Sequence, residues 1–205
     1  MPAQTTRFVG ETFRVFRPAG YPDRLDDIAS DYGDLLNVTQ VQLRPNVQTY
    51  LCQHDEIAPH TDHFAADTIM WICHHQDAYD GSIILRDGLR ALDILSYDER
   101  EILQKIELRC RPLTGNGALQ SHPVLTEPGG KLFFAPWLPL VEDVPIYRHV
   151  LHTFHSALMD EQTIVASVRL EAGQALLINN KRLTHSRAQI STDSPRHLTR
   201  YWIRT

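Results

Sequence analysis

The hydrophobic positions of this chain fall mostly into short runs that are separated by glycine, proline and polar turns. Such runs are typical of β-strands that contribute one or both faces to a core. We expect strands at residues 13–16, 38–52, 68–73, 82–85, 163–170, 175–178 and 196–204. Pro45 predicts an edge position or a break in the second of these, because proline cannot donate a hydrogen bond to a neighbouring strand. The pattern as a whole predicts a mainly β protein.

Three stretches carry helical signals instead. Residues 21–36 and 145–159 place apolar side chains three and four positions apart, which is the spacing of one helix face. The second of these begins with a proline, which a helix tolerates in its first turn. Ser96 and Glu99 match a capping box, so we expect a helix from there to about Leu108. Residues 111–142 hold five of the twelve prolines, which predicts loops and short strands.

Composition places the chain among ordinary soluble globular proteins. It has 205 residues, of which 42% are hydrophobic and 22% are charged, so we expect one domain. The net charge is -5 without a basic block, which argues against nucleic-acid binding. Cys52, Cys73 and Cys110 are far apart and odd in number, which predicts reduced thiols and a cytoplasmic location. We find no apolar signal core near the start and no apolar run long enough to span a membrane.

The strongest candidate for chemistry is the pair His60 and Asp62. Side chains two positions apart in an extended strand point to the same side, so this imidazole and this carboxylate can meet one cation. Segments 54–56 and 75–77 also place a histidine two positions before an acidic residue. The order of elements favours His60, because an apolar run follows it and a much later apolar run ends in another histidine. The alternative is that His60 and Asp62 form a solvated strand end.

A metal site needs a third ligand, and His185 is the best candidate because it closes the later run. Two histidines and one carboxylate on one side of a metal form the facial triad of non-haem Fe(II) oxygenases. A metal between an early and a late strand of a mainly β chain predicts a double-stranded β-helix (jelly-roll) barrel. We expect a single oxygenase domain over residues 1–205. Residues 1–58 would supply N-terminal strands and a short helix, and residues 59–205 the metal-bearing barrel core.

Arginines in the last predicted strand form a second cluster. Arg196, Leu198, Arg200, Trp202 and Arg204 share one face of that strand by alternation. If His185 points into the barrel, a return strand brings Arg196 or Arg200 near the metal, where a guanidinium binds a carboxylate through two hydrogen bonds. The alternative is a basic edge strand whose charges protect it from pairing.

Together these motifs resemble the taurine-dioxygenase (TauD/TfdA) and clavaminate-synthase-like family of Fe(II)/2-oxoglutarate-dependent oxygenases. The resemblance runs from about His60 to Trp202, and it depends on the order and spacing of segments that are not specific alone. The matching segments are His60-Thr61-Asp62, the apolar residues 69–73, the Asp87-Gly88 turn, residues 173–180, Arg182-x-x-His185-x-Arg187 and Arg196-x-x-x-Arg200.

The resemblance implies a role for each of the main residues. His60, Asp62 and His185 match the iron ligands. Arg196, eleven positions after His185, matches the arginine that binds the distal carboxylate of the cosubstrate 2-oxoglutarate. Arg200 matches a position that often faces an anionic group of the substrate. Because only spacing separates the two arginines, their roles are interchangeable at this point.

Other positions follow or depart from the family pattern. His63 lies beside the ligands and is a candidate for substrate contact, whereas Asn180 matches a structural position before the second histidine. Many relatives carry a threonine that helps to hold 2-oxoglutarate. That position is Ile83 here, and the neighbouring Ser82 is the candidate substitute. The carboxylate at Asp62 argues against the halogenating relatives, in which chloride takes that ligand position.

The resemblance implies an enzyme that uses Fe(II) and converts 2-oxoglutarate into succinate and carbon dioxide. The expected reaction is hydroxylation of a C–H bond in an amino acid or small anionic metabolite, although desaturation and ring closure stay open. The chain is short before His60, which implies that part of the usual substrate cover is missing.

Two alternatives belong to other functional classes. A zinc hydrolase can use the same three ligands to activate water, but it leaves Arg196 and Arg200 without a role. A non-catalytic barrel that binds a small ligand leaves the order of the metal ligands unexplained.

Overall fold

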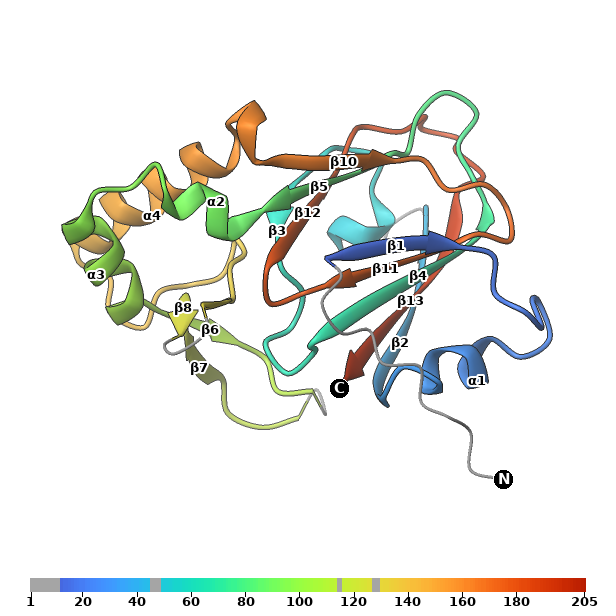
Figure 1. Cartoon of the computed structure of the whole chain (residues 1–205), viewed down its shortest axis with the longest axis horizontal. Helices are drawn as coiled ribbons and strands as arrows, with labels where there is room; N and C mark the ends of the chain where they lie inside the picture. Colours follow the sequence, from blue (N-terminus) through green and yellow to red (C-terminus); the bar gives the residue numbers. More distant parts are fainter. Residues whose placement is uncertain (1–11, 45–48, 114–115, 127–129) are drawn as a thin grey trace.

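The computed structural model describes residues 12–44, 49–113, 116–126 and 130–205, and Figure 1 shows that two antiparallel sheets form its centre. The five-stranded sheet has the order β1 (Phe13–Phe16), β11 (Ala175–Asn179), β4 (Thr68–His75), β13 (His197–Arg204) and β2 (Asp34–Gln42). The four-stranded sheet has the order β10 (Ile164–Val168), β5 (Ile83–Asp87), β12 (Leu183–Arg187) and β3 (Ile57–His60). In both sheets, strands that are distant in the chain become neighbours.

The main core lies between the facing sides of the two sheets. Trp71 of the five-stranded sheet belongs to the same buried cluster as Leu85 of the four-stranded sheet. Met70 points the opposite way and packs in a cluster with α1 (Leu25–Ser30), which covers the outer face. Because β4 is covered on both faces, its sequence is a continuous apolar run rather than an alternating one.

The mainly β architecture expected from the sequence is present as these two facing sheets. Within the described residues, strand pairing does not join them into one closed barrel. The chain crosses from one sheet to the other after β11, since β12 pairs with β5 and β3 rather than with β11. The division of the chain between residues 58 and 59 stays a prediction.

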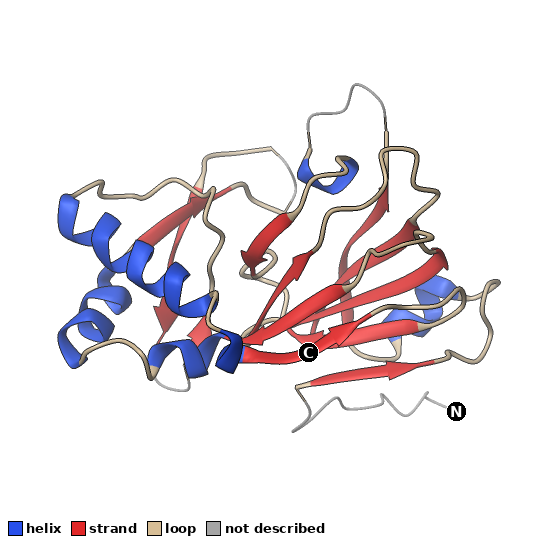
Figure 2. Ribbon diagram, turned by 90° about the horizontal axis from the view of Figure 1, so that it is seen from above, coloured by secondary structure: helices blue, strands red, loops and turns tan. Residues whose placement is uncertain are grey.

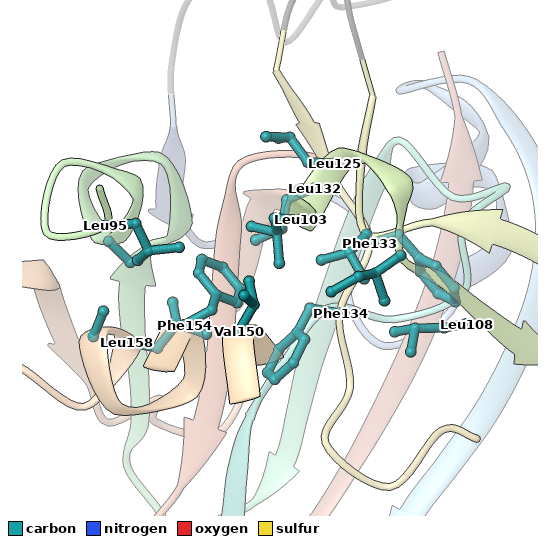
Figure 3. Close-up of a cluster of buried hydrophobic side chains, with 14 of the residues drawn as sticks. Leu95, Leu103, Leu108, Leu125, Leu132, Phe133, Phe134, Val150, Phe154 and Leu158 are labelled. Carbon is teal, nitrogen blue, oxygen red and sulfur yellow. The ribbon is translucent and has the colours of Figure 1, made fainter. Parts of the chain in front are cut away.

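A second core lies at the end of the molecule where the helices gather, which Figure 2 shows from above. Its elements are α2 (Gly88–Leu92), α3 (Tyr97–Lys105), α4 (Pro145–Leu158), and the paired strands β6 (Glu107–Cys110) with β7 (Gln120–Pro123) and β8 (Leu125–Thr126) with β9 (Lys131–Leu132). Figure 3 shows Phe134 and Phe154 in this cluster, and their rings meet edge to face at 5.2 Å. The backbone of Phe134 also exchanges hydrogen bonds with Thr61. The second core therefore supports the segment that follows β3.

The predicted helices are present with different ends. The capping box is confirmed, because Ser96 Oγ accepts from the Glu99 N–H while the Glu99 carboxylate accepts from the Ser96 N–H. The helix ends at Lys105, earlier than predicted, because β6 follows at once. α1 is shorter than the predicted 21–36, since β2 begins inside that stretch. No helix of the described ranges has both the length and the apolar character needed to cross a membrane.

Two other local predictions need correction. Asp87-Gly88 is the start of α2 rather than a simple turn, because Asp87 accepts hydrogen bonds from the Leu89 and Arg90 N–H groups. The predicted strand 38–52 corresponds to β2, which begins earlier and ends at Gln42. The short 3-10 turns η1 (Tyr50–Cys52) and η2 (Glu161–Thr163) complete the elements. Pro45 lies outside the described residues.

Candidate metal centre

Strand pairing brings His60 and His185 together. They are directly opposite each other on the antiparallel strands β3 and β12, and their ring centroids are 4.2 Å apart. Directly opposed side chains point to the same face of a sheet, which explains how two distant histidines meet. Trp71 covers His185 from the facing sheet, with its ring edge-on at 4.8 Å. Both imidazoles are buried, with 2% and 7% of their surface exposed.

Asp62 reaches the two histidines from a loop. β3 ends at His60, so the strand alternation used to predict this pair is not what positions Asp62. Instead, the Asp62 N–H donates to Asn180 Oδ1 at 2.8 Å, and Arg200 Nη1 donates to Asp62 Oδ1 at 2.6 Å. The second oxygen, Oδ2, lies 3.9 Å from His185 Nε2. The three side chains converge as expected, but through contacts that involve distant residues.

The geometry of this cluster suits a divalent transition metal. One ligand atom from each of the three residues lies within 4.8 Å of the other two. Asp62 Oδ2 is buried and has no hydrogen-bond partner among the described residues. Buried polar atoms nearly always have a partner, and a cation would provide one here. Two imidazoles and one carboxylate on one side are the donor set of non-haem Fe(II) sites, and zinc accepts the same donors.

The protonation states also suit a metal. Burial lowers the pKa of His60, and burial together with the charges of His60 and Arg200 lowers the pKa of His185 well below its ordinary value. His60 Nδ1 lies 2.9 Å from the carbonyl oxygen of Ala58, which can only accept, so Nδ1 carries the proton and Nε2 the lone pair. Neutral imidazoles are the form that binds metals.

The two rival segments do not form a comparable site. In the described part of the chain, His60, Asp62 and His185 are the only group of three or more such side chains that could hold a metal. His54 and Asp55 lie 3.6 Å apart at the surface. The carboxylate of Asp77 instead accepts hydrogen bonds from backbone N–H groups of its own loop. The fold therefore brings His60, and neither rival histidine, into a group that could hold a metal, and the choice of His60 as a ligand stays a prediction.

Arg196 lies in a buried cavity beside the two histidines. Both imidazoles, Arg187, Arg196 and Ile83 are among the residues that line this inner cavity. Arg196 is 4% exposed, yet its guanidinium makes no hydrogen bond or ion pair with any described residue. Burial and repulsion from Arg187 lower the pKa of Arg196 to about 10, so it is charged at neutral pH. A buried cation without a partner is costly, so this cavity favours an anionic ligand.

Arg200 lies beside the ligand cluster, where it pairs with Asp62. Its bond to Asp62 is buried on both sides, with 4% and 1% of the two side chains exposed. The guanidinium also lies over the ring of Trp202, 5.1 Å from the centroid. Arg204 lies at the exposed end of β13 and pairs with Asp34, so it does not share the site with the other arginines. Contact between Arg200 and a substrate stays a prediction.

Ile83 rather than Ser82 forms the wall of the inner cavity. The two residues are adjacent in the chain, and Ser82 is not part of the lining. The Ser82 N–H donates to Asp80 Oδ1, which holds the turn before β5. The cavity is therefore apolar where many relatives place a threonine hydroxyl, and the cosubstrate contact expected for Ser82 stays a prediction.

Two residues beside Arg196 were not assigned a role from the sequence. Arg187 lies two positions after His185, so its spacing is a usable signal, and its Nη2 donates to the carbonyl oxygens of Gln53 and Asp55. Gly81 has a φ of +92°, and a methyl group built on it would lie 3.1 Å from Cδ and Nε of Arg196. No local pattern predicts this close contact, which only glycine allows at that position.

A second cavity, which we call the outer cavity, borders Asp62. It has a volume of about 530 Å³, and Asp62, His63, Trp137 and Trp202 are among its lining residues. His63 Nε2 lies 3.0 Å from the carbonyl oxygen of Arg111, and its ring stacks on Trp202 at 5.4 Å. His63 is thus beside the ligand cluster, where the sequence placed it. The cluster borders both cavities, so ligands in each can approach the same metal.

Replacing Asn180 with alanine is expected to destabilise the protein by about 2–4 kcal/mol, because two buried backbone groups lose their partner. Asn180 accepts from the Asp62 N–H and donates to the carbonyl oxygen of Ala66 at 2.8 Å. The loop that carries Asp62 also loosens, so metal affinity should fall roughly tenfold. Urea unfolding and metal titration measure the two effects. Gln162→Ala on the exposed η2 turn is the control, and equal results for both variants would contradict this role.

A family model described as "Taurine catabolism dioxygenase TauD, TfdA family" matches residues 4–202. The recognisable sequence motifs begin only at His60. The family match begins well before that residue, so it also covers the N-terminal strands. A search of curated proteins finds no match.

Several solved structures have a similar fold. An asparagine oxygenase in complex with Fe(II), 2S,3S-3-hydroxyasparagine and succinate is 18% identical with a TM-score of 0.68, and the match covers 82% of this chain but 56% of that one. The PvcB protein from Pseudomonas aeruginosa is 16% identical with a TM-score of 0.70, covering 95% and 76% of the two chains. The oxygenase OrfP in complex with Fe, succinate and (3S)-hydroxy-L-Arg is 14% identical with a TM-score of 0.70, covering 95% and 75%. At these identities the similarity establishes the fold alone.

Proposed function

Since the chain belongs to the TauD and TfdA family of 2-oxoglutarate-dependent dioxygenases, we propose that it is a non-haem Fe(II) enzyme that hydroxylates a C–H bond of a small substrate. One observation carries this proposal. The His–Asp–His cluster lies beside Arg196, a buried cation with no anionic partner among the described residues. A divalent metal would bind the His–Asp–His cluster, and one carboxylate of a dicarboxylate would pair with Arg196.

Each residue of the site then has a task. Bound iron would couple conversion of 2-oxoglutarate and dioxygen into succinate and carbon dioxide to insertion of one oxygen atom into the C–H bond. His60, Asp62 and His185 would hold the metal through two imidazoles and one carboxylate. Arg196 binds the distal carboxylate of 2-oxoglutarate through charge-assisted hydrogen bonds.

Neighbouring side chains orient the ligands and exclude water. Arg200 holds Oδ1 of Asp62, so that Oδ2 faces the metal. Trp71 and Ile83 line the inner cavity with apolar surface, which strengthens the pairing of Arg196 with an anion. We place these residues on a jelly-roll scaffold, which the two facing antiparallel sheets support.

For the substrate we propose an amino acid or a small anionic metabolite. Two similar structures hold hydroxylated amino acids, 3-hydroxyasparagine and (3S)-hydroxy-L-Arg. The outer cavity supports a small substrate, because it borders Asp62 and lies within reach of the metal. His63 lines this cavity and is the residue that we propose for substrate contact.

The zinc hydrolase uses the same three ligands but explains less of the site. Water activation needs no second, buried anion site, so Arg196 would have no function there. The oxygenase uses both the ligand cluster and the inner cavity, and for this reason it is the function that the geometry supports best.

Anaerobic addition of Fe(II) and then 2-oxoglutarate tests the proposal directly. A metal that binds the keto acid through two oxygens should produce a visible metal-to-ligand charge-transfer band, and Zn(II) in place of Fe(II) should not. Oxygen should then release succinate when candidate amino acids are present. If no band forms at saturating 2-oxoglutarate while Fe(II) is bound, the oxygenase assignment fails.

A further inference from the structure

The outer cavity is apolar although it borders a charged cluster. Most of its exposed lining is apolar, and its largest apolar side chains are Leu113, Phe133, Leu138, Trp137 and Trp202. Trp137 is 44% exposed, and its ring lies 4.7 Å from the ring of His60. The exposed indole ring of Trp137, in a cavity beside the candidate metal ligands, is a surface on which a flat ligand can stack.

The charges around this cavity do not favour a small anion next to the metal. Asp62 is the acidic residue of the lining, and Arg200 neutralises it from the inner cavity rather than from the outer one. Among the described residues that line the outer cavity, the cation is Arg111, which is exposed. Near the ligand cluster the cavity therefore presents rings, and the cation is at its solvent side.

The size of the outer cavity suits a ligand that has a ring near the ligand cluster and a polar group near the solvent. A volume of about 530 Å³ lies within the range of small-molecule sites and accommodates a phenyl or indolyl group together with a short polar chain. Offset stacking on an indole adds a favourable interaction that an aliphatic or amide group does not provide.

We propose that the substrate carries a flat aromatic group that stacks on Trp137 in the outer cavity, with its carboxylate directed toward Arg111 at the solvent side. This inference rests on the proposed function and narrows its substrate class to aromatic amino acids and related aromatic acids. The oxidised C–H bond would then belong to the ring or to the carbon chain beside it, because the ring side of the cavity borders Asp62.

Binding to the anaerobic protein loaded with Fe(II) and 2-oxoglutarate tests the inference without turnover. The probes are L-phenylalanine, L-tryptophan and the neutral fragment indole, compared with L-asparagine and L-arginine. Titration calorimetry should give the aromatic amino acids an affinity at least about tenfold higher than that of the polar pair. The aromatic probes should also shift the charge-transfer band, since the cavity that they fill borders Asp62.

Variants of Trp137 show whether the ring is responsible. Trp137→Ala should weaken binding of L-tryptophan about tenfold, whereas Trp137→Phe, which keeps a flat ring, should retain most of the affinity. The half-exposed position makes both variants compatible with folding, and circular dichroism checks this. Tyr97→Ala removes an aromatic side chain that is 76% exposed on α3 and should leave binding unchanged.

The possible outcomes separate this inference from the proposed function. If the charge-transfer band forms but L-asparagine or L-arginine binds as well as the aromatic probes, the substrate class is wrong and the oxygenase assignment stands. The aromatic substrate class is also wrong if no aromatic probe binds, or if Trp137→Ala and Trp137→Phe have the same affinity for L-tryptophan. If no band forms, the proposed function fails, and quenching of tryptophan fluorescence by indole analogues still tests the cavity.

Discussion

Replacing Arg196 with methionine is expected to raise the concentration of 2-oxoglutarate needed for half-saturation at least about thirtyfold. Loss of one partner of a buried, charge-assisted pair costs roughly 2–5 kcal/mol, and each 1.4 kcal/mol is about a factor of ten in affinity. Arg196 is 4% exposed and lines the inner cavity, and its guanidinium has no partner among the described residues. Titration of the charge-transfer band with 2-oxoglutarate measures the change.

The same substitution should leave the free energy of unfolding unchanged or raise it. Arg196 is a buried cation whose guanidinium has no partner among the described residues, and methionine fills a similar volume without that desolvation cost. Loss of cosubstrate affinity without loss of stability would separate binding from folding. Arg17→Met is the control, because Arg17 is exposed and pairs with Glu171 at the surface. If Arg187→Met abolishes binding and Arg196→Met does not, then Arg187 is the anchor instead.

Replacing His185 with alanine is expected to lower the affinity for Fe(II) by more than about a hundredfold. Losing a residue that only orients a ligand costs about 10–100-fold in metal affinity, so losing one of the three proposed direct ligands should cost more. His185 is also the ligand that strand pairing holds most firmly, opposite His60 and under Trp71. Anaerobic titration calorimetry with Fe(II), or with Mn(II) as a stable substitute, measures the loss.

His152→Ala is the matched control for this variant. His152 is exposed on α4 and belongs to no ligand cluster in the described part of the chain, so its removal should not change metal affinity. Circular dichroism of the metal-free proteins shows whether His185→Ala still folds. Equal affinities for the wild type and a folded His185→Ala protein would remove the metal site and favour a non-catalytic barrel.

The convergence of His60, Asp62 and His185 was predictable from the sequence, although part of the reasoning was wrong. His60 and Asp62 were paired on the basis of strand alternation, yet β3 ends at His60 and Asp62 lies in a loop. The order of the apolar runs still identified the three residues that the fold brings together. The order of the runs is still informative, because the two histidines meet through the pairing of β3 with β12. That pairing does not depend on how the Asp62 carboxylate is positioned.

The arginines show the opposite case. The spacing after His185 located Arg196 and Arg200 but did not distinguish their roles. In the fold, Arg196 lines the inner cavity, whereas Arg200 donates a hydrogen bond to Asp62, which is 138 positions away in the chain. Trp137 had no sequence signal at all, because it lies in a proline-rich segment where neither helical nor strand periodicity applies.

By itself the sequence determined the elements whose cause is local. β4 is a continuous apolar run, α4 has a regular apolar face, and α3 begins at a capping box formed by residues three positions apart. Only the tertiary structure decided which sheet each strand joins, which arginine lacks an anionic partner within the described residues, and which rings line the outer cavity. Periodicity and capping depend on neighbours within one or two turns of chain, whereas these features depend on contacts between residues more than a hundred positions apart, such as Asn180 with Asp62.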